Sequence, residues 1–389
     1  MVGSMSRALN PVLAGLPTTI FTHMSVLAAA HDAVNLGQGF PDTDGPLGIR
    51  ETAARALLQG PNQYAPMRGV PELRAAIAAH AQAHYGLAYD PDSEVIVTCG
   101  ATEAIVAALL AVARPGAEVV LVEPTYDSYR PIAEAAGLTV KSVVLSPPDW
   151  RLTDAALQAA ISDRTAAILI NSPQNPIGRV LTRAELESVA RAAGAADAVV
   201  ICDEAYEHLA YDAAHVPLAT LPGLRERTLR IGSAGKIFSL TGWKVGLVVA
   251  APDLLRVVSK AHQFLTFTTP PNLQAAVAFG LAKPDAYFAD MRAAFQRSRD
   301  RLTQGLQALG FDVIPSQGTY FLNIDIAPLG ETDDVAFCKR LVVDHGVADI
   351  PVSAFYAENP VRNVVRLCFS KNDATLDAGL GRLARVLGK

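Results

Sequence analysis

The sequence predicts an α/β protein with a mostly parallel sheet in a large domain, together with a smaller α+β domain. From about residue 95, short and nearly continuous apolar runs alternate with alanine-rich helical patterns, which is typical of strands covered by helices on both faces. Past about residue 283 this alternation stops. The 389 residues are 50% hydrophobic and 18% charged, which is enough apolar material for large buried cores.

The expected elements follow from these patterns in chain order. Residues 1 to about 40 are irregular, and they end in the Gly- and Pro-rich loop Asn35–Asp42. The strands expected next are 94–98, followed by a helix at 102–113, and then 118–122, 166–170, 198–202 and 228–232. The last part should form a long amphipathic helix at 285–310, strands at 311–315, 320–326 and 364–369, and a closing helix at 374–387. We therefore expect an N-terminal arm that also contributes to the small domain (1–40), a large domain (41–282) and a small C-terminal domain (283–389).

Composition argues against several classes of protein. The net charge of −5 and the pI of about 5.9 give no reason to expect binding to nucleic acid or to an anionic membrane. Pro11, Pro17 and His23 interrupt the N-terminal apolar residues, so no signal peptide is expected. Apolar runs such as Val245–Ala251 are much shorter than the ~20 residues of a transmembrane helix. The 4 cysteines form no CxxC pair and HExxH is absent, so we expect reduced thiols, no metal site and a cytoplasmic location.

Polar residues follow the expected strands at the points where those strands end. They are Gly100–Glu103, Asn171, Asn175, Asp203, Ser233 and Lys236. Because ligands of open α/β sheets bind beyond the carboxyl ends of the strands, one ligand can contact all of these residues. The turn Gly100–Glu103 also opens a helix, where free backbone N–H groups and the helix dipole favour an anion. An ordinary helix cap is the alternative for this turn.

Lys236 ends the segment Gly232-Ser-Ala-Gly-Lys236, which partly matches a P-loop. A P-loop needs glycine at 230 and Ser or Thr at 237, where this chain has Arg230 and Ile237, so we reject a nucleotide site of that kind. The small residues before Lys236 leave room for a covalent ligand, such as an aldehyde cofactor bound to the lysine. A plain surface lysine is the alternative.

Asp203 provides a charge that matches such a cofactor. A pyridine ring withdraws electrons strongly only when its nitrogen is protonated, and a neighbouring carboxylate keeps the proton there. Tyr206 follows three residues later and can reach the same ligand from the side. The alternatives are a helix-capping or turn acid for Asp203 and ordinary core packing for Tyr206.

Four separated motifs resemble those of the pyridoxal-phosphate-dependent class I aminotransferases of fold type I. They are Ser172-Pro-Gln-Asn-Pro-Ile-Gly178, Asp203-Glu-Ala-Tyr206, Ser233-Ala-Gly-Lys-Ile-Phe-Ser-Leu-Thr-Gly-Trp-Lys-Val-Gly246 and Arg366, in the family's order. The segment Asn35–Asp42 is most similar to the branch of methionine and kynurenine aminotransferases. The resemblance implies a seven-stranded, mostly parallel sheet, pyridoxal 5'-phosphate as cofactor, and a homodimer with shared active sites.

The resemblance also implies a role for each matching residue. Lys236 binds the cofactor covalently and then moves the substrate's α-proton, Asp203 pairs with the ring nitrogen, and Tyr206 contacts the ring hydroxyl, so these three are the expected catalytic groups. The other expected cofactor contacts are Asn175, Tyr126 on the ring face, Ala101, Thr102, Ser233 and Lys244 at the phosphate, and Tyr64 from the neighbouring subunit. The expected substrate contacts are Arg366, Asn175 and Gly39 at the carboxylate, and Phe21 and Phe267 along the side chain.

The implied reaction is a ping-pong transfer of an amino group from an amino acid to a 2-oxo acid. An aromatic and neutral pocket favours methionine, phenylalanine, tyrosine, glutamine or kynurenine over aspartate, although Thr268 stands where kynurenine enzymes have a histidine. One alternative is β-elimination from cysteine conjugates on the same residues. A more remote alternative is a non-enzymatic sensor of amino acids. The sequence leaves open the exact donor and acceptor, the pathway, and whether residues 1–4 belong to the natural chain.

Overall fold

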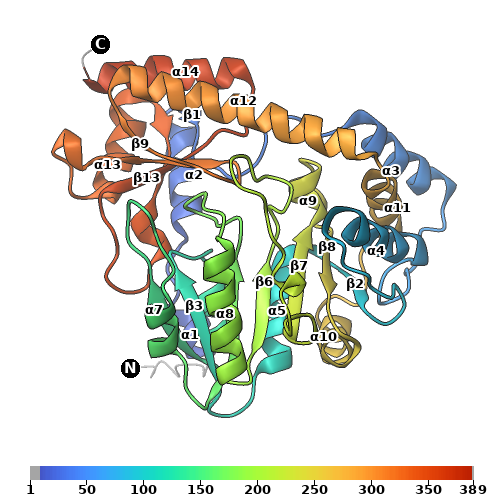
Figure 1. Cartoon of the computed structure of the whole chain (residues 1–389). Helices are drawn as coiled ribbons and strands as arrows, with labels where there is room; N and C mark the ends of the chain where they lie inside the picture. Colours follow the sequence, from blue (N-terminus) through green and yellow to red (C-terminus); the bar gives the residue numbers. More distant parts are fainter. Residues whose placement is uncertain (1–8, 388–389) are drawn as a thin grey trace, which may run out of the picture.

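The large sheet of the protein contains seven strands in the order β2-β8-β7-β6-β5-β3-β4. In this computed structural model, which describes residues 9–387, all neighbouring strands from β4 to β7 run parallel, whereas β8 is antiparallel to both β7 and β2 (Figure 1). The strands are β2 (Val95–Thr98), β3 (Glu118–Glu123), β4 (Thr139–Val144), β5 (Thr165–Asn171), β6 (Val199–Asp203), β7 (Thr228–Ser233) and β8 (Gly246–Val249). The predicted α/β fold with a mostly parallel seven-stranded sheet is confirmed.

Helices cover both faces of this sheet because its strands alternate their side chains between two apolar layers. Ile96, Val119 and Leu121 point into one buried cluster, and Val120 and Val122 into another. The helices of this part are α3 (Leu47–Gln59), α4 (Pro71–Tyr85), α5 (Gly100–Val112), α6 (Tyr129–Ala135), α7 (Asp154–Ala160), α8 (Arg183–Ala195), α9 (Ala234–Ile237), α10 (Pro252–Leu265) and α11 (Pro271–Leu281).

The second sheet is antiparallel and has the order β12-β13-β10-β9. Its strands are β9 (Asp312–Ile314), β10 (Phe321–Asp325), β12 (Ile350–Pro351) and β13 (Val364–Cys368), and β1 (Val34–Asn35) pairs separately with β11 (Val347–Ala348). The helices beside it are α2 (Ile20–Ala30), α12 (Asp285–Leu309), α13 (Asp334–Arg340) and α14 (Asp373–Leu383). Figure 1 shows α12 extending from α14 across to α3 and α11.

The N-terminal segment packs with the second sheet. Met24, Ala28 and Leu36 are buried in the same apolar cluster as residues of β10, β13 and α14. The limits proposed for the three parts, 1–40, 41–282 and 283–389, stay a prediction, and residues 1–4 lie outside the described part of the chain.

One apolar stretch is longer than the sequence analysis indicated. The stretch Pro11–Ala30 is long and apolar enough to cross a membrane by length and composition alone. In the structure it forms two separate helices, α1 (Pro11–Gly15) and α2, because Leu16 and Thr19 adopt extended backbone angles between them.

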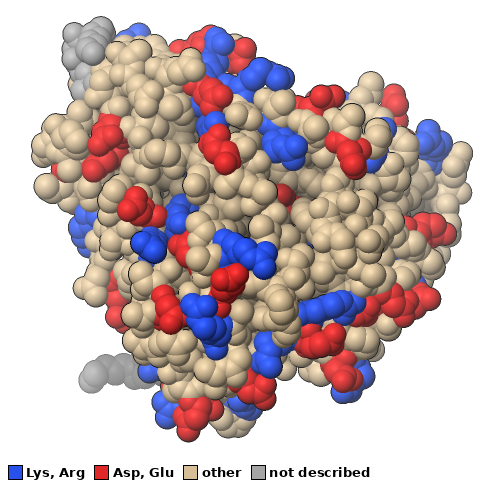
Figure 2. All heavy atoms as spheres, viewed as in Figure 1, with Lys and Arg blue, Asp and Glu red and all other residues tan. Residues whose placement is uncertain are grey.

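On the face drawn in Figure 2, residues of both charge signs are interspersed, with no large area of a single sign.

Candidate active site

A cavity of about 350 Å³ lies at the carboxyl ends of β5, β6 and β7, between the two sheets. Most of the residues predicted from the sequence line it. They are Phe21, Gly39, Ala101, Thr102, Tyr126, Asn175, Asp203, Tyr206, Ser233, Lys236, Lys244 and Arg366. The structure therefore gathers at one place side chains that the sequence separates by more than 300 residues.

The N-terminus of α5 forms one end of this cavity. Gly100 has a φ of 82°, a left-handed conformation that glycine adopts without strain. A Cβ at this position would lie 3.3 Å from the ammonium nitrogen of Lys244, and the backbone of Gly246 packs directly behind it. This end of the cavity suits a phosphate, because the N–H groups of the first turn of α5 and the Lys244 ammonium group lie together there.

Asp203 lies at the end of β6, deep in the cavity and 6% exposed. Its Oδ2 accepts a hydrogen bond from the Tyr129 hydroxyl at 2.6 Å, and its Oδ1 accepts one from the backbone N–H of Ala205 at 3.0 Å. Burial raises the pKa of Asp203, while these two hydrogen bonds and the charge of Lys236 oppose the rise. A cationic group in the cavity would further favour the ionised carboxylate.

Lys236 lies in the short helix α9, directly after β7. Its Nζ donates to the Tyr320 hydroxyl at 2.7 Å and points to the Gly39 carbonyl at 3.4 Å. Desolvation by burial lowers the pKa of Lys236 to about 8, and the nearby cations Lys244 and Arg366 act in the same direction. The lowered pKa leaves a substantial fraction of neutral amine near neutral pH, which is the form that attacks a carbonyl carbon.

Arg366 extends from the middle of β13 into the cavity and is 1% exposed. Its Nη1 donates to Asn175 Oδ1 at 2.8 Å and its Nη2 to the Gly37 carbonyl at 3.0 Å. Its Nε has no hydrogen-bond partner among the described residues. Asn175 and Gly37 thus orient the guanidinium, which retains N–H donors for a carboxylate ligand.

Two predicted residues, Tyr64 and Phe267, do not line this cavity. Tyr64 is 84% exposed and Phe267 39% exposed, and their rings contact each other edge to face with centroids 5.4 Å apart. Phe267 therefore does not contact the cavity of its own chain, and its expected contact with the substrate stays a prediction. The chain leaves α10 through a left-handed φ of 67° at Phe267, close to Tyr64 and away from the cavity.

Several residues of the site were missed in the sequence. The Tyr129 hydroxyl donates to Asp203, Tyr320 bonds both Lys236 and Gly39, and the Gly37 carbonyl accepts from Arg366 and so orients it. Tyr129 follows the expected site residue Tyr126 by three positions, across a turn closed by the bond from the Tyr129 N–H to the Tyr126 carbonyl, so its place in the sequence could have indicated it. Tyr320 lies just before β10 in the second sheet, and no local pattern marks it.

Comparison with known proteins decides which family this site belongs to. The family model described as aminotransferase class I and II matches residues 31–383. The chain belongs to the class I and II aminotransferases. It is 46% identical to the probable N-succinyldiaminopimelate aminotransferase DapC of Mycobacterium tuberculosis, over 94% of this chain and 96% of the relative. A solved structure of N-succinyldiaminopimelate aminotransferase from that organism superposes with a TM-score of 0.95 at 47% identity, and the match covers 98% of this chain and 100% of that one. The chain is also 42% identical to the methionine aminotransferase of Escherichia coli (95% and 96%), and 37% identical to human kynurenine–oxoglutarate transaminase 1 (90% and 92%).

This aminotransferase is a pyridoxal-phosphate enzyme, and its own residues fit that cofactor. The turn at Gly100 beside Lys244 suits an anion, the Asp203 carboxylate is buried, and Lys236 is an amine with a lowered pKa. When bound, pyridoxal phosphate supplies an aldehyde that takes up the amino group and a ring that withdraws electrons from the substrate's α-carbon.

The remaining chemistry belongs to the protein. Asp203 would hold a proton on the ring nitrogen, and Tyr129 and Ala205 orient it for this purpose. Arg366, oriented by Asn175, would bind the carboxylate of the amino acid and so position its α-carbon. Lys236 would move the α-proton, since its amine can exchange a proton near neutral pH.

Proposed function

We propose that the aminotransferase takes the amino group of a neutral or aromatic L-amino acid and transfers it to a 2-oxo acid by a ping-pong mechanism. The surroundings of Arg366 support this proposal best. Its guanidinium lies 3.9 Å from the ring centre of Phe321, 5.1 Å from that of Phe355 and 5.4 Å from that of Phe21. Among the described residues that line the cavity, Arg366 is the one guanidinium. The site thus has an arginine for the α-carboxylate and apolar surface for the side chain.

Asp127 adds a reason to disfavour acidic side chains. It lines the cavity, and its pKa is raised by burial, an effect that the charge of Arg366 opposes. An aspartate side chain would bring a second carboxylate close to this group, and the described residues that line this cavity include no second arginine to pair with it. Like charges in a buried site repel, so acidic donors should bind less well.

We expect methionine, phenylalanine or kynurenine to exceed aspartate in kcat/KM by at least about tenfold, the value of roughly one favourable contact. The measurement is a panel of amino donors against several 2-oxo acids, with product identification. Asp127→Asn is the matched variant, and it should narrow the gap by improving aspartate. A preference for aspartate in the unmodified enzyme would contradict the proposal.

A longer donor with a distant carboxylate is a second candidate. A neighbouring cavity of about 800 Å³ shares Tyr126 and Asp127 with the site and reaches the cations Arg130 and Lys339. The similarity to the N-succinyldiaminopimelate aminotransferase of Mycobacterium tuberculosis makes an N-acylated diamino acid the compound to include in the panel. A kcat/KM for N-succinyldiaminopimelate well above that for methionine would favour this candidate. Pyruvate and ammonia released from a cysteine conjugate would indicate the β-elimination alternative.

We further propose that the enzyme is a homodimer with shared sites, in which Tyr64 and Phe267 contact the cofactor and substrate of the neighbouring chain. These two residues form an exposed aromatic pair, and the nearby Phe264 is 85% exposed. Large exposed aromatic side chains are typical of subunit interfaces. The cytoplasmic location stays a prediction.

Mixing two inactive variants tests the shared site. When Lys236→Ala and Tyr64→Ala homodimers exchange subunits, half the dimers are mixed, and one site in each mixed dimer combines an intact Lys236 with an intact Tyr64. About a quarter of all sites should therefore regain activity. Lys236→Ala mixed with Arg366→Ala is the control, because both residues belong to one chain's cavity and no site recovers. Proven exchange without recovery in the first mixture would rule out the shared site.

A further inference from the structure

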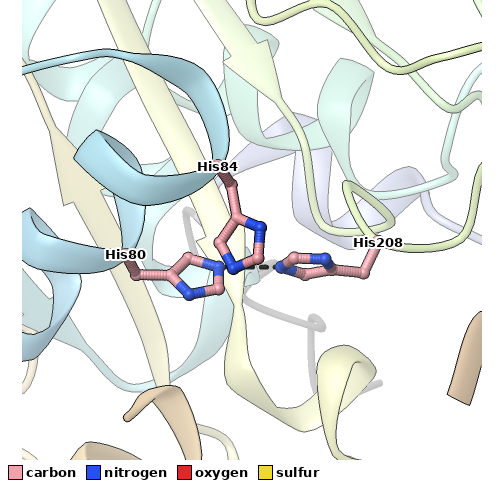
Figure 3. A group of neighbouring side chains, drawn as sticks. All are labelled: His80, His84 and His208. Carbon is pink, nitrogen blue, oxygen red and sulfur yellow. Dashed lines mark hydrogen bonds between the residues drawn. The ribbon is translucent and has the colours of Figure 1, made fainter. Parts of the chain in front are cut away.

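Three histidines converge at a place outside the active site. His80 and His84 are four residues apart on α4, and His208 lies in the loop after β6, 128 residues beyond His80. Figure 3 shows the three rings with a nitrogen of each directed toward the other two. One nitrogen from each ring lies within 4.8 Å of the others. No Cys/His motif in the sequence predicted this group, because only the fold brings His208 to the His80–His84 pair.

The surroundings make this group a defined site rather than a chance encounter on the surface. His80 is 7% exposed and His208 5% exposed, while the side chain of His84 retains 18% of its exposure. Phe288 stacks on the His208 ring at 4.6 Å and contacts both other rings edge to face, at 5.1 Å each. Phe288 therefore packs against all three rings, and the partly exposed His84 side chain gives access to solvent.

The geometry is close to that of a tetrahedral metal site. Zn–N bonds of about 2.0–2.1 Å at tetrahedral angles place ligand nitrogens about 3.3 Å apart. The Nε2 atoms of His80 and His208 are 2.7 Å apart, so they need to separate by about 0.6 Å, and His84 needs to move inward. Rotation of side chains alone can supply movements of this size.

Charges and a further ligand are also within reach. An Asp285 carboxylate oxygen lies 3.8 Å from His84 Nε2 and can complete the coordination directly or through a water molecule. The buried carboxylate of Glu207 favours positive charge at both His80 and His208, against the larger opposing effect of burial. The Arg230 guanidinium acts against a cation here, but it is itself paired with Glu204 and Glu207.

We propose that His80, His84 and His208 bind one divalent transition-metal ion of the zinc class. Three neutral imidazoles with one open position suit Zn²⁺, Co²⁺ or Ni²⁺ rather than Mg²⁺ or Ca²⁺, which prefer oxygen ligands. The ion joins α4 to the loop that follows β6. Because His208 is two residues from Tyr206 and five from Asp203, a bound ion would restrain the segment from the end of β6 into the following loop, which contains both active-site residues. Its role is structural, and the ion takes no part in amino transfer.

The holoenzyme, free of any histidine tag and dialysed against a chelator that is then removed, is titrated with Co²⁺. We expect one equivalent per chain, with the visible d–d absorption of tetrahedral cobalt, which Zn²⁺ then displaces. The Tm should rise with the logarithm of free Zn²⁺, as expected for a ligand that binds the folded state. Metal content after gel filtration distinguishes binding to this site from loose binding to the surface or to the cofactor phosphate.

His84→Gln is the decisive variant, since the partly exposed His84 can change with little effect on the core. It should take up at least tenfold less Co²⁺ at equal free metal and lose the zinc-dependent rise in Tm. His31→Gln, at an exposed histidine outside the cluster, is the matched control and should bind like the unmodified enzyme. If the unmodified enzyme binds no metal, or if His84→Gln binds as much as the His31→Gln control, the three rings are only a hydrogen-bonded, packed cluster and the proposal is wrong.

Discussion

Replacing Lys236 with alanine should reduce turnover by about 10²–10⁴-fold, the usual contribution of a positioned proton-transfer group. The variant should still fold, because the change removes a cationic amine from a place where burial already lowers its pKa to about 8. It should also still bind pyridoxal phosphate, since the phosphate end and Asp203 are unchanged. Borohydride reduction followed by peptide mass spectrometry should find the cofactor attached at Lys236 in the unmodified enzyme and nowhere in the variant.

Lys244→Ala is the control that distinguishes the two lysines of the cavity. Lys244 lies beside Gly100 at the N-terminus of α5, so its loss should weaken cofactor binding while the covalent bond at Lys236 still forms. A small primary amine added to Lys236→Ala should restore part of the activity, which a misfolded protein would not show. Cofactor attached at Lys244 in the unmodified enzyme would show that Lys236 is not the covalent residue.

Much of the fold can be predicted from the sequence because it depends on local patterns of apolar residues. The continuous apolar runs at β3, β5, β6 and β7 mark strands buried on both faces, and each was placed to within a few residues. The helix expected at 285–310 is α12, Asp285–Leu309. β4 was missed because its side chains alternate between partly buried and exposed, as befits an edge strand. The sequence indicates only an apolar stretch at β8, since a strand of 4 residues gives little periodicity.

The sequence predicts the residues of the site that lie at or just after the ends of strands in the large sheet. Asp203 is the last residue of β6, Lys236 lies in the short helix directly after β7, and the order of the strands brings the two residues together. Tyr320 and Gly37 were missed because they reach the cavity from the second sheet and the N-terminal segment, whose positions depend on tertiary packing. Phe267 lies outside the cavity of its own chain, and its expected contact with the substrate stays a prediction. Its ring direction follows from the left-handed turn after α10, which the sequence does not show.

Replacing Asp203 with asparagine should lower kcat/KM by at least about 100-fold while leaving the fold intact. The two side chains have nearly the same shape, so the hydrogen bonds from Tyr129 and Ala205 can be kept in part. What is lost is the negative charge that would hold a proton on the ring nitrogen. Removing one partner of a buried ion pair costs about 3–5 kcal/mol, and 1.4 kcal/mol corresponds to about tenfold in rate.

The effect of Asp203→Asn can be separated from general damage to the site by a matched variant. Tyr129→Phe removes only the hydroxyl that bonds Asp203 Oδ2. This hydrogen bond lowers the pKa of Asp203 against the larger effect of burial, so its loss should raise the pKa of the carboxyl further. A higher pKa makes the carboxyl neutral over a wider acidic range, so the acidic limb of the kcat/KM profile should move to higher pH. Asp203→Asn should instead be slow at every pH, because no carboxylate forms. Near-normal turnover in Asp203→Asn, or an unchanged acidic limb in Tyr129→Phe, would mean that another group holds the proton on the ring nitrogen.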